Sequence, residues 1–153
     1  QGLNVNMTGV SASIGLSQIK RYINKLLPER KNIFDYYNKF FQKFTWAIIP
    51  EKKSDFSESS CHLYMLRING INEKNRDKMI EYISSKKVGV NVHYIPMPML
   101  TLFKNLGYDI KDFPNTYKLY SNEISLPIYN GLSTEKLDYV CKVVSDAYNY
   151  LKI

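Results

Sequence analysis

Apolar residues recur at three- and four-residue spacing from Leu16 to Phe41, and this run constrains the fold more than any other part of the chain. Such spacing is typical of one side of an α-helix and predicts helix over residues 8–43, with Thr8 as the N-cap. Pro28 lacks a backbone N–H and disfavours helix at the residue before it, so we expect a kink or a break near this position. The residues of the run are Leu16, Ile19, Ile23, Leu26, Leu27, Ile33, Phe34, Tyr37, Phe40 and Phe41.

The rest of the chain mixes short alternating patterns, typical of strands, with amphipathic helix patterns. The predicted strands cover residues 44–49, 61–71, 88–94 and 125–128. The predicted helices cover residues 73–86, 99–105, 114–122 and 134–151. The fold class that follows is α+β, a two-layer domain with helices packed on one face of a small antiparallel or mixed sheet. The length of 153 residues suits one domain with a real core.

The composition is that of an ordinary globular protein with an excess of lysine. The net charge is +7 and the sequence pI is about 9.3. Because the lysines are scattered and form no block, they indicate a solvated surface rather than a dedicated anion-binding patch. The 13 tyrosines offer flat amphipathic surface. A basic, tyrosine-rich binding or protein-interaction module therefore remains an alternative to an enzyme.

Cysteine usage and the absence of long apolar runs predict a cytoplasmic protein without a membrane anchor. Cys61 and Cys141 lack CxxC spacing, which favours reduced, partly buried thiols. No apolar run approaches the length of a membrane helix, and no basic segment is followed by the apolar stretch of a signal peptide.

The residues alone do not define an enzyme site. No nucleophile elbow, HExxH, P-loop or dinucleotide-binding glycine motif is present, and His62 and His93 do not indicate a metal site. His93 ends a predicted strand just before Pro96, in a place where folds often put polar working groups. A histidine that only hydrogen-bonds at a strand edge explains the same position. The apolar segment 96–100 suits packing, an interface patch or the wall of a pocket.

Several phrases, in a fixed order, resemble the C-terminal half of the DegT/DnrJ/StrS-type nucleotide-sugar aminotransferases. They are GLNVNMT at 2–8, SASIGLSQI at 11–19, Arg30, HLYMLR at 62–67, VHYIP at 92–96, GY and FP within 107–114, and SLPIY with LS within 125–133. Each phrase alone is weak evidence, but together they span nearly the whole chain.

The resemblance implies a fold-type-I enzyme that depends on pyridoxal 5'-phosphate, with residues 1–153 as its small C-terminal domain and the helical region 8–43 included in that domain. In this family a large N-terminal domain holds the cofactor and the Schiff-base lysine, which lies upstream of the first phrase. The resemblance therefore implies that no catalytic residue lies in this chain, and that the chain alone is inactive. Lys20 and Lys25 lie on a predicted helix surface, where nothing activates an amine.

The family pattern also implies roles for four residues. Asn4 would reach across a homodimer interface and donate its amide N–H to the cofactor phosphate of the partner subunit. Asn6 stands where the family has a basic residue that faces the substrate or the cofactor region, and it would contact the substrate. His93 and Tyr94 would lie where the nucleotide sugar binds.

The implied reaction transfers an amino group, usually from glutamate, to a keto-sugar linked to a nucleoside diphosphate, in cell-surface polysaccharide biosynthesis. The cofactor serves as the electron sink. Pro98 replaces a second histidine of the family pattern, which bears on the substrate taken. Lys87 replaces a helix-ending glycine, and a left-handed lysine would cost ~1 kcal/mol.

Overall fold

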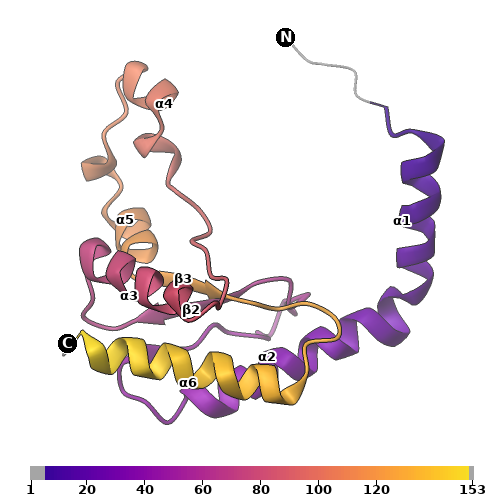
Figure 1. Ribbon diagram of the computed structural model, residues 1–153. Helices are drawn as coiled ribbons and strands as arrows, with labels where there is room; N and C mark the ends of the chain where they lie inside the picture. Colours follow the sequence, from indigo (N-terminus) through magenta and orange to yellow (C-terminus); the bar gives the residue numbers. More distant parts are fainter. Residues whose placement is uncertain (1–5, 152–153) are drawn as a thin grey trace.

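The computed structural model describes residues 6–151, which combine helices with a few short strands (Figure 1). The elements are α1 (Gly9–Arg21), the π-helical turn η1 (Tyr22–Leu26), α2 (Leu27–Phe41), β1 (Ala47–Ile48), β2 (Tyr64–Ile68), α3 (Glu73–Ser85), η2 (Met97–Met99), α4 (Thr101–Asn105), η3 (Ile110–Asp112), α5 (Pro114–Ser121), β3 (Glu123–Leu126) and α6 (Thr134–Tyr150). Helices α2 and α6 lie on one side of the sheet, and α3 packs against α6 and β3 (Figure 1). This arrangement confirms the predicted α+β fold. None of the helices in the described part of the chain is long and apolar enough to span a bilayer.

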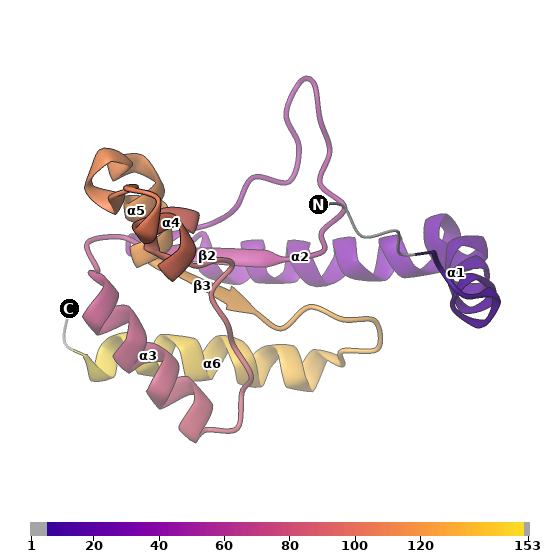
Figure 2. The same cartoon turned by 90° about the horizontal axis from the view of Figure 1, so that it is seen from above.

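Helices α1 and α2 form the N-terminal helical stretch. Thr8 is confirmed as the N-cap of α1, because its hydroxyl accepts a hydrogen bond from the N–H of Ser11 at 3.2 Å. Between the two helices, the N–H of Leu27 bonds to the carbonyl of Tyr22, which gives one wider π-helical turn directly before Pro28. The chain stays helical through this turn, so of the two predicted outcomes the kink is confirmed. Figures 1 and 2 show α1 turned away from the direction of α2.

The two helices differ in burial although both carry the predicted apolar spacing. Helix α2 buries Ile33, Phe34, Tyr37 and Phe41 in the core. Helix α1 buries no residue, and each of its large apolar side chains is more than half exposed. These side chains are Val10, Ile14, Leu16 and Ile19. The pattern therefore predicted helix in both segments, but it did not show what covers α1.

The strands form an antiparallel sheet in the order β1-β2-β3. Of the two predicted alternatives, the antiparallel sheet is therefore confirmed. The register places Tyr64 opposite Leu126, and Arg67 opposite Glu123. Since side chains alternate along a strand, Met65 and Arg67 lie on the face of β2 away from the buried core. Directly opposed residues share a face, so Glu123 accompanies Arg67.

An aromatic cluster joins α2 to β2. The ring centroids of Phe34 and Tyr64 lie 4.9 Å apart, as do those of Tyr37 and Tyr64. The buried hydroxyls are satisfied, because Tyr37 donates to the carbonyl of Pro127 at 2.8 Å and Tyr64 donates to Asn38 at 2.9 Å. Burial raises the pKa of both tyrosines. The cluster thus combines apolar packing with fixed hydrogen-bond directions.

Helix α6 completes the core with one apolar side. The residues it buries are Leu137, Val140, Cys141, Val143, Val144 and Ala147. Cys61 and Cys141 are both free and buried. Burial raises the pKa of Cys141 to about 12 and raises the pKa of Cys61 as well. Both thiols therefore stay protonated and act as packing groups.

The segment 88–94 does not form the predicted strand. Its pairing to the sheet is limited to Asn91, which bridges β3 through backbone N···O distances of 3.3 and 2.7 Å. The side chain of Asn91 accepts the N–H of Val92 at 2.8 Å, and the carboxylate of Glu123 accepts the N–H of His93 at 3.0 Å. Side-chain acceptors thus replace the carbonyls of a strand ladder, and the prediction of a strand is wrong.

After His93 the chain forms an arm that contains η2, α4 and η3 and returns to the sheet through α5 (Figure 1). Aromatic contacts of 5.9 and 6.5 Å join Tyr108 to Phe103 and Phe113 within the arm. Many other apolar side chains of the arm are exposed, among them Ile95, Met97, Leu100, Leu102 and Leu106. Figure 1 shows the arm and α1 rising on the same side of the molecule at opposite ends.

Lys87 has the left-handed conformation that the sequence predicts, with φ of 59° directly after α3. Because a Cβ is disfavoured there, Lys87→Gly should raise the free energy of unfolding by about 1 kcal/mol in urea denaturation. Lys86→Gly is the matched control, since Lys86 has an ordinary φ of −90° and should lose stability on the same change. Equal responses of the two variants would contradict this account.

Candidate functional site

A cavity of about 500 Å³ opens between the outer face of the sheet, the start of the arm and α5. Its position follows from the fold, because the alternation of β2 turns Met65 and Arg67 to this side and α5 crosses above them. The lining residues are Pro50, Glu51, Met65, Arg67, His93, Tyr94, Pro96, Thr116, Leu119, Tyr120 and Glu123. An apolar wall with a few convergent polar groups is the usual composition of a small-molecule site.

His93 is held in this cavity by β3. Its Nδ1 lies 2.8 Å from the hydroxyl of Ser125, and its backbone N–H donates to Glu123 at 3.0 Å. The Ser125 hydroxyl in turn donates to the other carboxylate oxygen of Glu123. Tyr94 meets the His93 ring edge to face at 4.7 Å and is 74% exposed, so it forms the rim.

Glu123 is a buried carboxyl group with a defined set of partners. Burial raises its pKa, while the hydrogen bonds from Ser125 and from the N–H of His93 oppose that shift. Behind it, Arg76 is 1% exposed and donates to the backbone carbonyls of Tyr120 at 2.8 Å and Glu123 at 3.2 Å. A buried cation therefore fixes the end of α5 and the start of β3.

Arg67 is the cation on the cavity wall. It is partly buried, lies opposite Glu123 in the sheet, and has no ion-pair partner among the residues the structure describes. A guanidinium in this state can take an anionic group of a ligand through paired hydrogen bonds.

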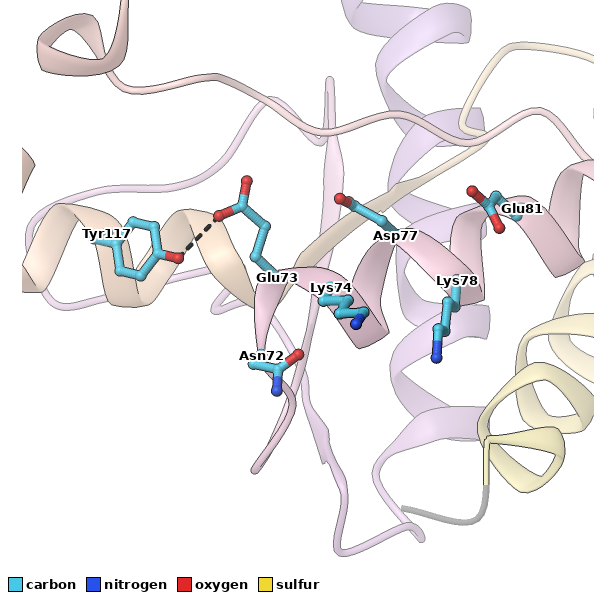
Figure 3. A pocket seen from close by; sticks show the side chains of 7 residues that line it. All are labelled: Asn72, Glu73, Lys74, Asp77, Lys78, Glu81 and Tyr117. Atoms are coloured by element: carbon cyan, nitrogen blue, oxygen red, sulfur yellow. Dashed lines mark hydrogen bonds between the residues drawn. The ribbon is translucent and has the colours of Figure 1, made fainter.

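A larger hollow of about 620 Å³ runs along α3 (Figure 3). It is lined by Asn72, Glu73, Lys74, Asp77, Lys78, Glu81 and Tyr117. In Figure 3 the Glu73 carboxylate turns to the Tyr117 hydroxyl, which donates to it at 2.9 Å, whereas Lys74 and Lys78 extend away from it. Charges of both signs on a solvent-facing helix are typical of a hydrated surface, so the cavity at His93 is the better candidate.

The structure brings together two of the four predicted site residues. His93 and Tyr94 both line the cavity. Asn6 is exposed directly before α1 and does not line it. Asn4 lies outside the described residues.

The sequence reasoning missed Glu123 and Ser125, and it gave Arg67 no role. The charged residue at the start of the phrase EISL was the available signal, because a strand buried along its length rarely starts with a carboxylate. Which residue it meets depends on sheet register, which the sequence did not reveal.

Comparison with known proteins places this chain in a family. Residues 1–145 match the model of the DegT/DnrJ/EryC1/StrS aminotransferase family. The chain belongs to this family. Aminotransferases of the family depend on pyridoxal phosphate.

Relatives of known sequence and structure agree with this placement. The chain is 36% identical over 151 residues to an uncharacterised protein of Methanocaldococcus jannaschii, covering 95% of the chain and 39% of that protein. It is 32% identical to the spore coat polysaccharide biosynthesis protein SpsC of Bacillus subtilis, covering 95% and 38%. The PLP form of Spr1654 of Streptococcus pneumoniae, assigned as a sugar aminotransferase, superposes with a TM-score of 0.90 at 37% identity, covering 95% and 37%. The chain thus spans less than half the length of these relatives.

Proposed function

We propose that the protein containing this chain is a pyridoxal-phosphate-dependent aminotransferase that moves an amino group from glutamate to a keto-sugar carried on a nucleotide, in cell-surface polysaccharide biosynthesis. The family match over residues 1–145 carries the proposal. Relatives named for spore coat polysaccharide and lipopolysaccharide biosynthesis support the pathway class. We further propose a cytoplasmic homodimer.

The residues of this chain do not by themselves fit the cofactor. The cavity at His93 is lined by no lysine, although the cofactor requires one to bind it covalently. Lys20 and Lys25 belong to α1 and η1, where their surroundings are exposed. We therefore assign the covalent attachment to residues outside this chain, and the partner's phosphate contact to Asn4, as the family pattern predicts.

We propose that residues 1–153, with the helical region 8–43, form the small C-terminal domain of this enzyme. Helix α1 supports this, because at 100° per residue its apolar side chains lie on two sides. Val10 and Ile14 lie on one side, and Leu16 and Ile19 lie on the other. A helix that is apolar on two sides is normally buried between two surfaces. The rest of the subunit and the partner subunit would supply them.

The cavity at His93 is the part of the nucleotide-sugar site that this chain contributes. Arg67 offers its guanidinium to the diphosphate. Tyr94 offers a largely exposed ring at the rim for the base or the sugar. His93 contacts the sugar. Apolar Met65 and Leu119 shield these contacts from water.

Substituting His93 with alanine in the full-length enzyme tests this assignment. We expect the KM for the nucleotide sugar to rise roughly 10-fold, the loss of one good hydrogen bond, with the half-reaction with glutamate nearly unchanged. His62→Ala is the matched control, since this second histidine does not line the cavity. Equal effects of both variants on KM would rule out a binding role for His93.

The proposal that the cofactor's lysine lies outside this chain can be tested by spectroscopy. The isolated chain, mixed with pyridoxal phosphate, should leave the visible spectrum of the free cofactor unchanged, whereas the full-length protein should shift it. The full-length protein then tests the proposed reaction directly, by transfer of the amino group of glutamate to a nucleotide-linked keto-sugar. A band in the isolated chain that one lysine substitution abolishes would contradict the assignment of the lysine.

A further inference from the structure

We infer that Glu123 and Ser125 are positioning residues, which hold the ring of His93 so that its Nε2 meets the ligand as a hydrogen-bond acceptor. The three side chains form one hydrogen-bonded chain, in which His93 Nδ1 lies 2.8 Å from Ser125 and Ser125 contacts Glu123. Ser125 and Glu123 are 4% exposed, so water does not compete for these bonds. The identity of the ligand rests on the proposed function, but the geometry of the three hydrogen-bonded side chains does not.

With the Glu123 carboxyl group ionised, the direction of the hydrogen bonds follows from the number of protons available. The backbone N–H of His93 can only donate, so one oxygen of Glu123 accepts there at 3.0 Å. The other oxygen accepts the single hydroxyl proton of Ser125. The Ser125 oxygen can then only accept from His93, which places a proton on Nδ1 and leaves a lone pair on Nε2.

The backbone around these three hydrogen-bonded side chains holds them in place. The N–H of Ser125 donates to the carbonyl of Asn91 at 2.7 Å, two residues before His93. Arg76 holds the carbonyl of Glu123 from behind at 3.2 Å. Two separate anchors therefore fix the serine and the carboxylate relative to the imidazole, as a positioning role requires.

A specific ligand chemistry follows from an acceptor at Nε2. The described residues offer this nitrogen no hydrogen-bond partner, and His93 lines the cavity, so a ligand donor would complete it. A sugar hydroxyl or amide N–H can donate to it, whereas a phosphate oxygen cannot. Arg67, on the same wall, is left to take the anionic group. The site thus separates recognition of the sugar from recognition of the diphosphate.

Glu123→Gln tests the direction of these hydrogen bonds without changing the size of the side chain. An amide must use its oxygen for the N–H of His93, which turns its NH₂ group toward Ser125. Ser125 would then accept from Gln and donate to His93 Nδ1. The variant should therefore move the imidazole proton from Nδ1 to Nε2, so that the cavity presents a donor in place of an acceptor. Ser125→Ala should remove the preference of His93 for either tautomer.

The measurement is the tautomer of His93 in the full-length holoenzyme, labelled with ¹⁵N-histidine and observed by NMR at neutral pH. The His93 signals are those lost in His93→Gln. We expect the proton on Nδ1 in the wild type and on Nε2 in Glu123→Gln. Wild-type protein with the proton on Nε2, or on both nitrogens, would overturn the inference. A tautomer that Glu123→Gln leaves unchanged would overturn it as well.

Kinetics of the same variants separate this inference from the proposed function. Glu123→Gln and Ser125→Ala should each raise the KM for the nucleotide sugar roughly 10-fold and change kcat less than about 2-fold. Ser145→Ala removes a hydroxyl that bonds to the carbonyl of Cys141 on α6, and it should leave both constants unchanged. Equal KM values in all variants would overturn the positioning role. The expected tautomers without any aminotransferase activity would support the positioning of His93 by Ser125 and Glu123, and they would overturn the proposed function.

Discussion

Replacing Arg76 with alanine should lower the free energy of unfolding of the isolated chain by about 3 kcal/mol. The guanidinium donates to the buried carbonyls of Tyr120 and Glu123, pairs with Asp77 at 2.7 Å, and lies 4.8 Å from the ring centre of Tyr120. Alanine removes the guanidinium donor from both carbonyls, of which that of Tyr120 keeps the backbone N–H of Asn122, and opens a cavity in place of the side chain. Urea denaturation of the isolated chain measures the loss.

Two further variants separate the causes. Arg76→Met keeps most of the volume, so any stability it recovers over alanine is packing, and the remaining loss belongs to the unpaired carbonyls. Lys78→Ala removes a cation from the exposed side of the same helix and should stay within about 0.5 kcal/mol of the wild type. An Arg76→Ala variant as stable as Lys78→Ala would show that the two carbonyls find water instead.

Arg76 also connects the core to the cavity. It holds the start of β3, from which Glu123 and Ser125 reach His93. Loss of Arg76 should therefore disturb the imidazole even where the domain stays folded. Stability and ligand contact depend here on one buried side chain.

Local patterns in the sequence predicted most of the helices, because helix periodicity and capping are properties of neighbouring residues. Thr8 as N-cap and the kink before Pro28 both follow from short-range sterics and hydrogen bonding, whereas the left-handed Lys87 was expected from the family pattern. The strand over 88–94 was wrong for a non-local reason. The carboxylate of Glu123, distant in sequence, takes the N–H of His93 that a strand ladder would need.

The candidate site shows the same difference between features set by neighbouring residues and features set by residues distant in sequence. His93 and Tyr94 were predicted from a local phrase that resembles a family pattern, and both line the cavity. Glu123 and Arg67 meet through the pairing of β2 with β3, and this register is set by which strand faces the core buries. The sequence alone could therefore predict two residues of the cavity wall but not the groups that hold His93.

Helix α1 gives the second large prediction, because the proposed docking of the small domain would give it a different environment in the full-length protein. Ile19→Asp should destabilise the full-length protein by on the order of 4 kcal/mol, since it removes a buried apolar side chain and places a charge in an apolar contact. In the isolated chain, where Ile19 is 72% exposed, the same change should cost less than about 0.5 kcal/mol. Thermal and urea unfolding of both proteins, with and without the substitution, give the comparison.

The control for this comparison is Lys20→Asp, which adds a carboxylate at the next position of α1, where the helix already carries a charge. It should have a small effect in both proteins, because lysine keeps its ammonium group in water. A large loss confined to Ile19→Asp in the full-length protein would place apolar surface of the remaining enzyme against this side of α1. Small losses in both proteins would mean that α1 stays exposed, and residues 1–153 would then not dock through this helix as a small domain does.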